Sequence, residues 1–145
     1  MSEKIVYTTS AINTGAREGE SHSPDHSYEV NIDVPKEMGG KGDGTNPEQL
    51  FAMGYSACYH AALNHYKKEE KISNRSQVTL TVHLHKDPED GGFKLSVEIE
   101  VGVEDMPEEK AQTLADKAHT YCPYSKATRG NIDVSIKGVP YVEGK

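Results

Sequence analysis

The segment from Asn46 to about residue 70 constrains the fold most, because its pattern predicts one long helix that is apolar on most sides. Asn46 suits the N-cap, Pro47 suits the first helical position, and Gln49 stands where a capping box places Gln or Glu. A helix that is apolar nearly all round is a buried helix. Its small residues also allow another backbone to approach closely: Gly54, Ser56, Ala57, Ala61 and Ala62.

The segments on either side of this helix predict strands in hairpin pairs. Alternation of apolar and polar residues predicts strands at 3–13, 26–34, 77–86, 93–103 and 132–136. Further helices are expected from Pro107 to about Cys122 and from Pro123 onward. Paired strands, in contrast to strands that alternate singly with helices, favour an α+β fold with antiparallel sheet. The 145 residues fit one domain, residues 1–145.

Charge and hydropathy exclude several classes of function. The chain carries 16 Lys and Arg against 23 Asp and Glu, so its net charge of −7 gives no basic surface for nucleic acid. No window of about 18 apolar residues exists, so we expect no membrane span. The first ten residues lack the apolar run of a signal peptide, so we expect a cytoplasmic protein. A hydrophobic content of 34% predicts a thin core, which favours oligomerisation.

The two cysteines are the most informative residues, because a cytosolic pair is more often catalytic, redox-sensing or metal-binding than structural. Cys58 lies about twelve residues into the long helix. A thiol in such apolar surroundings is either core filler or, beside a buried cation, a nucleophile. Cys122 precedes Pro123; if Pro123 opens a helix, Cys122 caps it, and the free amides lower its pKa. Cys122 is therefore either a reactive thiol or a surface cysteine.

Two charged residues and the histidines complete the set of candidates. Arg17, in the turn of residues 15–19, is either a solvated charge or a cation on a loop that folds over a site. The second role needs a carboxylate to aim the guanidinium, and Glu48 is a candidate; otherwise Glu48 only favours the helix start. Seven histidines raise the question of metal binding, but His83 and His85 have no third and fourth ligand by spacing. We therefore expect no metal.

Two long motifs each hold one cysteine and identify a family. They are NPEQLFA at residues 46–52, which leads into GYSAC at 54–58, and CPYSKATRGN at 122–131. Together with the GAREG turn at 15–19 they closely resemble the organic hydroperoxide resistance (Ohr) branch of the OsmC/Ohr family. The likeness covers essentially the whole chain. It implies antiparallel sheets wrapped around long central helices in an intertwined homodimer.

The resemblance also implies an activity, which is that of a thiol peroxidase. It makes Cys58 the peroxidatic nucleophile and Cys122 the residue that resolves the sulfenic acid into an intramolecular disulfide. Arg17 matches the family's arginine, and Glu48 matches the glutamate that pairs with it. The usual reductant is a dihydrolipoyl dithiol, free or on a lipoylated protein, and no bound cofactor is implied.

The substrate expected from this resemblance is an organic hydroperoxide, alkyl or lipid. Its organic tail needs apolar neighbours, and the residue types suggest four candidates: Leu50, Phe51, Met53 and Met106. Two other functions stay open. The thiols can sense oxidation, or the pocket can hold a hydrophobic ligand, without turnover; alternatively the cysteines form a structural disulfide, which is rare in the cytosol.

Overall fold

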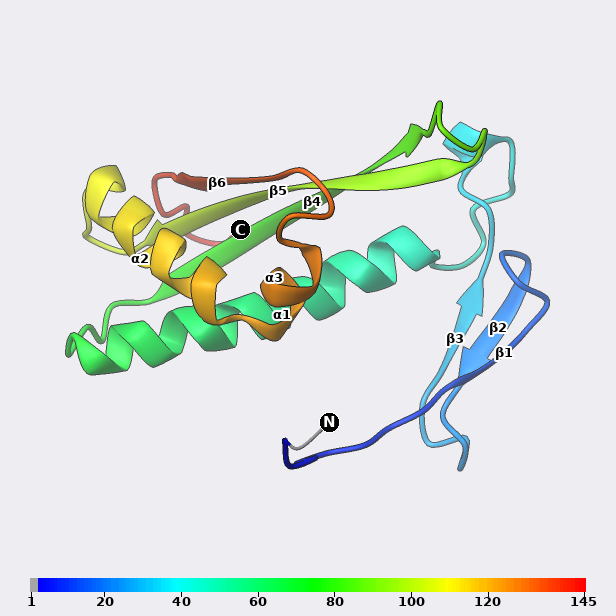
Figure 1. Cartoon of the computed structure of the whole chain (residues 1–145), viewed down its shortest axis with the longest axis horizontal. Helices are drawn as coiled ribbons and strands as arrows, with labels where there is room; N and C mark the ends of the chain where they lie inside the picture. Colours follow the sequence, from blue (N-terminus) through cyan, green and yellow to red (C-terminus); the bar gives the residue numbers. More distant parts are fainter. Residues whose placement is uncertain (1–2) are drawn as a thin grey trace. The chain divides into compact units, whose positions relative to one another are not determined.

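The structure is a computed structural model that describes residues 3–145 (Figure 1). The chain forms two compact units, with the boundary between Leu50 and Phe51. Helix α1 (Pro47–Glu69) begins in the first unit and continues into the second. The expected single domain of residues 1–145 stays a prediction, and its first two residues lie outside the described part.

The first unit contains a small antiparallel sheet in the order β1-β2-β3. Its elements are β1 (Ile12–Thr14), β2 (Gly19–His22), β3 (Glu29–Ile32) and the 3-10 helix η1 (Lys36–Met38). The turn between β1 and β2 closes with the Glu18 amide donating to the Gly15 carbonyl at 2.9 Å. A side chain at Gly19 would lie 1.9 Å from the Thr14 carbonyl oxygen, so this tight turn requires glycine there. Arg17 sits within the turn.

The strand expected at residues 3–13 is wrong over most of its length, because β1 begins only at Ile12. Ile5, Val6 and Tyr7 have strand-like side chains, but they are largely exposed and have no strand structure. A strand needs a neighbour for its backbone hydrogen bonds, and composition alone does not supply one. The strand expected at 26–34 is also shorter, and its apolar face is mostly uncovered: Tyr28 is 81% exposed.

The second unit is built from α1, three strands and two more helices. These elements are β4 (Ser76–Lys86), β5 (Phe93–Val103), α2 (Glu108–Tyr121), α3 (Pro123–Thr128) and β6 (Val134–Gly138). Strands β4 and β5 form the expected hairpin, paired from Ser76↔Val103 to Lys86↔Phe93. Strand β6 pairs parallel to β5, so the expectation of purely antiparallel sheet is corrected here. Helices α2 and α3 form the crossover that a parallel pair requires (Figure 1).

The core of the second unit lies where α1, β5 and α2 meet. Its buried side chains come from all three elements: Tyr55, Tyr59, Ala62, Leu63, Val97, Ile99, Val101, Val103, Ala111, Leu114, Ala115 and Ala118, joined by Cys122. The expectation that α1 is buried on most sides is wrong for the single chain. A stripe of α1 remains exposed at Met53, Ala57, Ala61 and Asn64.

The α+β class predicted from the sequence is confirmed, and the long helix and the β4–β5 hairpin stand where they were expected. Within residues 3–145, no helix combines the length and apolar character needed to cross a bilayer.

Candidate active site

Cys122 occupies the N-cap of α3, as the Cys-Pro sequence predicts. Pro123 is the first helical residue, and the Ser125 amide points at the Cys122 sulfur from 3.5 Å. The Cys122 side chain is buried. Helix α3 therefore holds this sulfur in a fixed position at its first turn.

Cys58 lies on α1, and its half-buried thiol faces Cys122. The two Sγ atoms are 3.6 Å apart, although the residues are 64 positions apart in the chain. Both thiols are reduced. A disulfide needs an S–S distance of about 2.05 Å, so a small movement of the side chains is enough to join them.

The surroundings of Cys58 oppose its ionisation. Burial raises the pKa of the Cys58 thiol, the backbone amide of Tyr124 lowers it by donating to the sulfur, and the adjacent Cys122 raises it again. The net direction is upward, because a thiolate loses hydration in the half-buried site. This unit alone therefore favours the neutral thiol, and an additional positive group is required for a stable thiolate.

Arg17 and Glu48 form a bidentate ion pair within the first unit. Arg17 Nη1 lies 2.8 Å from Glu48 Oε1, and Nη2 lies 3.3 Å from Oε2. The hydrogen bond with Glu48 raises the pKa of the Arg17 guanidinium and outweighs its burial. The pairing of Glu48 with Arg17 is thus as the sequence predicts. The approach of Arg17 to Cys58 stays a prediction, since the two belong to different units.

A hollow of about 320 Å³ opens beside Arg17 in the first unit. Its other lining residues are mostly apolar or small: Asn13, Ala16, Ser21, Ile32, Pro47 and Leu50. The structure therefore places one of the four expected pocket residues, Leu50, in the same hollow as the guanidinium.

The other three expected pocket residues belong to the second unit. Phe51 packs edge-on against Tyr55, with ring centroids 5.7 Å apart. Met53 is mostly exposed, and Met106 lies between β5 and α2, partly buried against the core. Their contact with substrate stays a prediction.

Sequence reasoning missed the aromatic and hydroxyl groups that border the two thiols. Tyr124 stacks obliquely on Tyr55, with ring centroids 5.5 Å apart, and its hydroxyl lies over Gly54. The Tyr55 hydroxyl in turn contacts Ser125. The available signal was spacing, since Tyr55 stands three residues before Cys58 and Ser125 three residues after Cys122.

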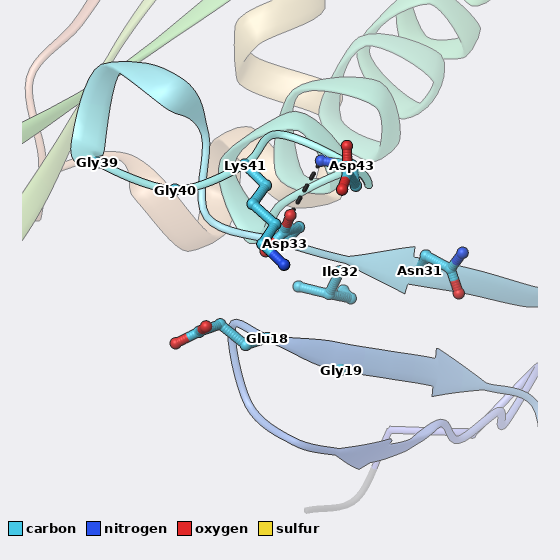
Figure 2. A pocket seen from close by; sticks show the side chains of 9 residues that line it. All are labelled: Glu18, Gly19, Asn31, Ile32, Asp33, Gly39, Gly40, Lys41 and Asp43. Atoms are coloured by element: carbon cyan, nitrogen blue, oxygen red, sulfur yellow. Dashed lines mark hydrogen bonds between the residues drawn. The ribbon is translucent and has the colours of Figure 1, made fainter.

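Figure 2 shows another hollow of the first unit, of about 530 Å³, which is polar. The carboxylates of Glu18, Asp33 and Asp43 gather there with Lys41, and the Asp43 amide donates to Asp33 Oδ2 at 2.9 Å. It contains neither a cysteine nor Arg17. Across residues 3–145, no three His, Cys, Asp or Glu side chains are arranged to hold a metal ion.

The site thus consists of two thiols within disulfide reach on an α+β scaffold. A family description, OsmC-like protein, matches residues 40–137. An organic hydroperoxide resistance protein-like 2 of Staphylococcus epidermidis is 49% identical over 133 residues, which cover 90% of this chain and 94% of that protein.

Solved structures agree with these sequence matches. The OhrB crystal structure from Bacillus subtilis is 44% identical with a TM-score of 0.83, covering 92% of this chain and 98% of that one. An organic hydroperoxide resistance protein from Elizabethkingia anophelis is 42% identical with a TM-score of 0.87, covering 96% and 100%. The chain belongs to the OsmC/Ohr family, and the resemblance seen in the sequence is confirmed.

Proposed function

We propose that the protein is a cytoplasmic thiol peroxidase that reduces organic hydroperoxides to alcohols through a Cys58–Cys122 disulfide. The observation that carries the proposal is the distance of 3.6 Å between the two sulfur atoms, with Cys122 fixed at the N-cap of α3. Relatives that are named for organic hydroperoxide resistance supply the substrate class. The reaction needs no bound metal or cofactor.

In the first step the Cys58 thiolate attacks the terminal oxygen of the hydroperoxide. An S–O bond forms, the O–O bond breaks, and the organic alkoxide leaves and takes up a proton. Because burial raises the pKa of Cys58, the thiolate needs a counter-ion. Arg17 serves this role in the proposal, since its guanidinium stays protonated when partly buried and offers several donors to both sulfur and leaving oxygen.

In the second step Cys122 resolves the sulfenic acid on Cys58. The S–S bond forms, the S–O bond breaks, and hydroxide leaves with the Cys122 proton as water. The Ser125 amide points at the Cys122 sulfur from 3.5 Å and holds it at the first turn of α3 during this step. A dihydrolipoyl dithiol, free or on a lipoylated protein, then reduces the disulfide by thiol–disulfide exchange and returns both thiols.

The preference for an organic substrate follows from the apolar lining beside Arg17. Leu50 and Ile32 share a hollow of about 320 Å³ with the guanidinium. We propose that Phe51, Met53 and Met106 also contact the organic tail of the substrate. Alkyl and lipid hydroperoxides then gain burial of apolar surface that hydrogen peroxide cannot provide.

The working form proposed here is an intertwined homodimer. The single chain leaves Ile5, Val6 and Tyr28 largely exposed, and α1 keeps its exposed stripe, which includes Met53. Exposed apolar patches in a soluble protein mark interaction surfaces. In the proposed homodimer, a second copy of the chain covers the exposed apolar residues of the first unit and the exposed stripe of α1.

The test is a turnover assay with cumene hydroperoxide and reduced dihydrolipoamide, run beside a thioredoxin system. We expect continuous loss of peroxide with the lipoyl donor, none for Cys58→Ser, and overoxidation after one turnover for Cys122→Ser. A burst of one equivalent per chain that stalls with every dithiol would show a sensor instead. No consumption at all would indicate a structural disulfide or a ligand-binding protein and would overturn the proposal.

A further inference from the structure

A buried hydroxyl cluster joins the helix of Cys58 to the helix of Cys122. The Tyr55 hydroxyl of α1 lies 3.0 Å from Ser125 Oγ and 3.0 Å from Thr128 Oγ1, both on α3. All three side chains are buried. Helix α3 and α1 are drawn next to each other in Figure 1, and these hydrogen bonds join them.

Counting protons gives the direction of each bond in this cluster. Thr128 Oγ1 donates its single proton to the Ser125 carbonyl oxygen at 3.2 Å. Tyr55 must therefore donate to Thr128, and Ser125 must donate to Tyr55, because each hydroxyl has one proton. The three groups form a closed chain of bonds that spans α3 from its third residue to its last.

Helix α3 depends on such contacts, because its six residues are too few to be stable alone. Ser125 has two roles in it: its side chain binds Tyr55, and its amide points at the Cys122 sulfur. Tyr55 itself stands one helical turn before Cys58. The Tyr55 hydroxyl thus ties the helix of one sulfur to the helix of the other, beside the packing of the Tyr124 ring on Tyr55.

We propose that Tyr55 is a positioning residue that holds Cys122 ready to resolve the Cys58 sulfenic acid, an inference that rests on the proposed peroxidase function. Without the hydroxyl, α3 samples more positions in the reduced and sulfenic forms, and the disulfide must then remove this freedom. Resolution slows, while the attack of Cys58 on peroxide does not use Tyr55 and keeps its rate. A longer-lived sulfenic acid meets a second peroxide more often and becomes sulfinic acid.

The variant that tests this is Tyr55→Phe, with Tyr59→Phe as its control. Tyr59 is also fully buried on α1, but its hydroxyl donates to the Ala115 carbonyl of α2 and does not reach α3. Each substitution removes one buried tyrosine hydroxyl from α1, so the control shows how much of any change in the resolution rate comes from losing such a hydroxyl in general. Rapid quench with a sulfenic-acid trap and mass spectrometry measures sulfenic, disulfide and sulfinic forms over time.

For Tyr55→Phe we expect resolution about tenfold slower, which equals about 1.4 kcal/mol, with Cys58 oxidation unchanged and more sulfinic acid at equal peroxide. Tyr59→Phe should resolve like the parent protein. The inference would be overturned if the parent protein and Tyr55→Phe formed disulfide and sulfinic acid in the same ratio. It would also be overturned if resolution slowed equally in Tyr55→Phe and Tyr59→Phe. If Tyr55→Phe does not fold, Ser125→Ala removes the same bond and keeps the amide that faces Cys122.

A second measurement keeps this inference separable from the proposed function. Equilibration with oxidised and reduced dithiothreitol gives the effective concentration of the thiol pair without any peroxide. We expect a fall of about tenfold for Tyr55→Phe and little change for Tyr59→Phe. If the parent protein consumes no peroxide but this difference appears, the peroxidase proposal fails and the positioning role stands; an absent difference refutes the positioning role whatever the peroxidase result.

Discussion

Lys67 provides a stability test that depends on one buried charge. Its side chain on α1 is 8% exposed, and its ammonium donates to Ser76 Oγ at 3.0 Å. The same oxygen lies 2.8 Å from His60 Nε2. No carboxylate of residues 51–145 forms an ion pair with this lysine. Burial accordingly lowers the pKa of Lys67.

Replacement of Lys67 by methionine should stabilise the protein by about 1 kcal/mol at neutral pH. A buried charge that lacks a counter-ion costs more in lost hydration than a hydroxyl partner returns, and an apolar side chain of similar length avoids that cost. Ser76 keeps His60 as a partner, so the substitution leaves no buried hydroxyl unpaired.

The pH dependence follows from the direction of the pKa shift. Because the folded-state pKa of Lys67 lies below the unfolded value of about 10.4, the unfolded chain binds more protons between the two values. The free energy of unfolding therefore rises with pH through that window, and this contribution is lost as the pH falls through the folded pKa. Lys67→Met removes this rise, so the advantage of the variant should shrink towards about pH 10.

Urea unfolding followed by circular dichroism, at one protein concentration and under reducing conditions, measures both effects. The control is Lys68→Met, because Lys68 is the neighbouring lysine and is exposed. Lys68→Met should change the free energy of unfolding by less than about 0.5 kcal/mol, both at neutral pH and at about pH 10. A loss of more than about 1 kcal/mol in Lys67→Met at neutral pH would refute the reasoning and show that the ammonium has a stabilising counter-ion.

Two further predictions concern the site. If Glu48 holds Arg17 in place, Glu48→Gln should raise the pKa of Cys58, which is measured from the pH dependence of Cys58 alkylation. The side chains of Arg17 and Glu48 are 43% and 18% exposed, so this change in the Cys58 pKa should stay under about one unit. A lowered pKa would mean that Glu48 only opposes the field of Arg17. Gly54→Ala places a methyl 3.1 Å from the Tyr124 hydroxyl, which lies at the far end of its side chain and can shift. The alanine gains up to about 1 kcal/mol in helix propensity, so we expect the melting temperature to stay unchanged or to rise. A clear fall in melting temperature would show that the Tyr124 ring cannot move.

The elements predicted correctly from the sequence are those whose signals are local. Asn46 caps α1, with its side-chain oxygen accepting from the Gln49 amide at 2.9 Å, and the helix begins at Pro47 as expected. The Cys122 cap followed from the proline after it. Caps, turns and alternation depend on residues a few positions apart, so they can be read without knowledge of the rest of the fold.

The errors concern pairing between distant segments. Residues 3–11 have strand composition but no strand structure, and β6 pairs parallel to β5. Nothing in the alternation of a strand specifies its neighbour or the direction of that neighbour. The exposed side of α1 has the same origin, because a sequence shows that a surface is apolar but not which segment packs against it.

The candidate site divides in the same way. The roles of Cys58 and Cys122 were predicted through the family motifs, and the structure adds that their sulfurs lie 3.6 Å apart. Tyr55 could not be singled out from the sequence, since a tyrosine in an apolar helix is typical of a core residue. Its importance comes from a hydroxyl contact 70 positions away, which only the folded chain reveals.

The location of these groups separates the two halves of the proposed cycle. Both sulfurs, the Tyr124 amide and the Tyr55 cluster belong to the second unit, whereas the Arg17–Glu48 pair belongs to the first. Disulfide exchange with a dithiol therefore needs only groups that the second unit holds in place. In the proposed cycle, reaction with hydroperoxide also uses the Arg17 cation of the first unit, because burial raises the pKa of Cys58. Arg17→Ala should thus abolish peroxide consumption and leave exchange of the Cys58–Cys122 disulfide with dithiothreitol intact; loss of both reactions would contradict this division.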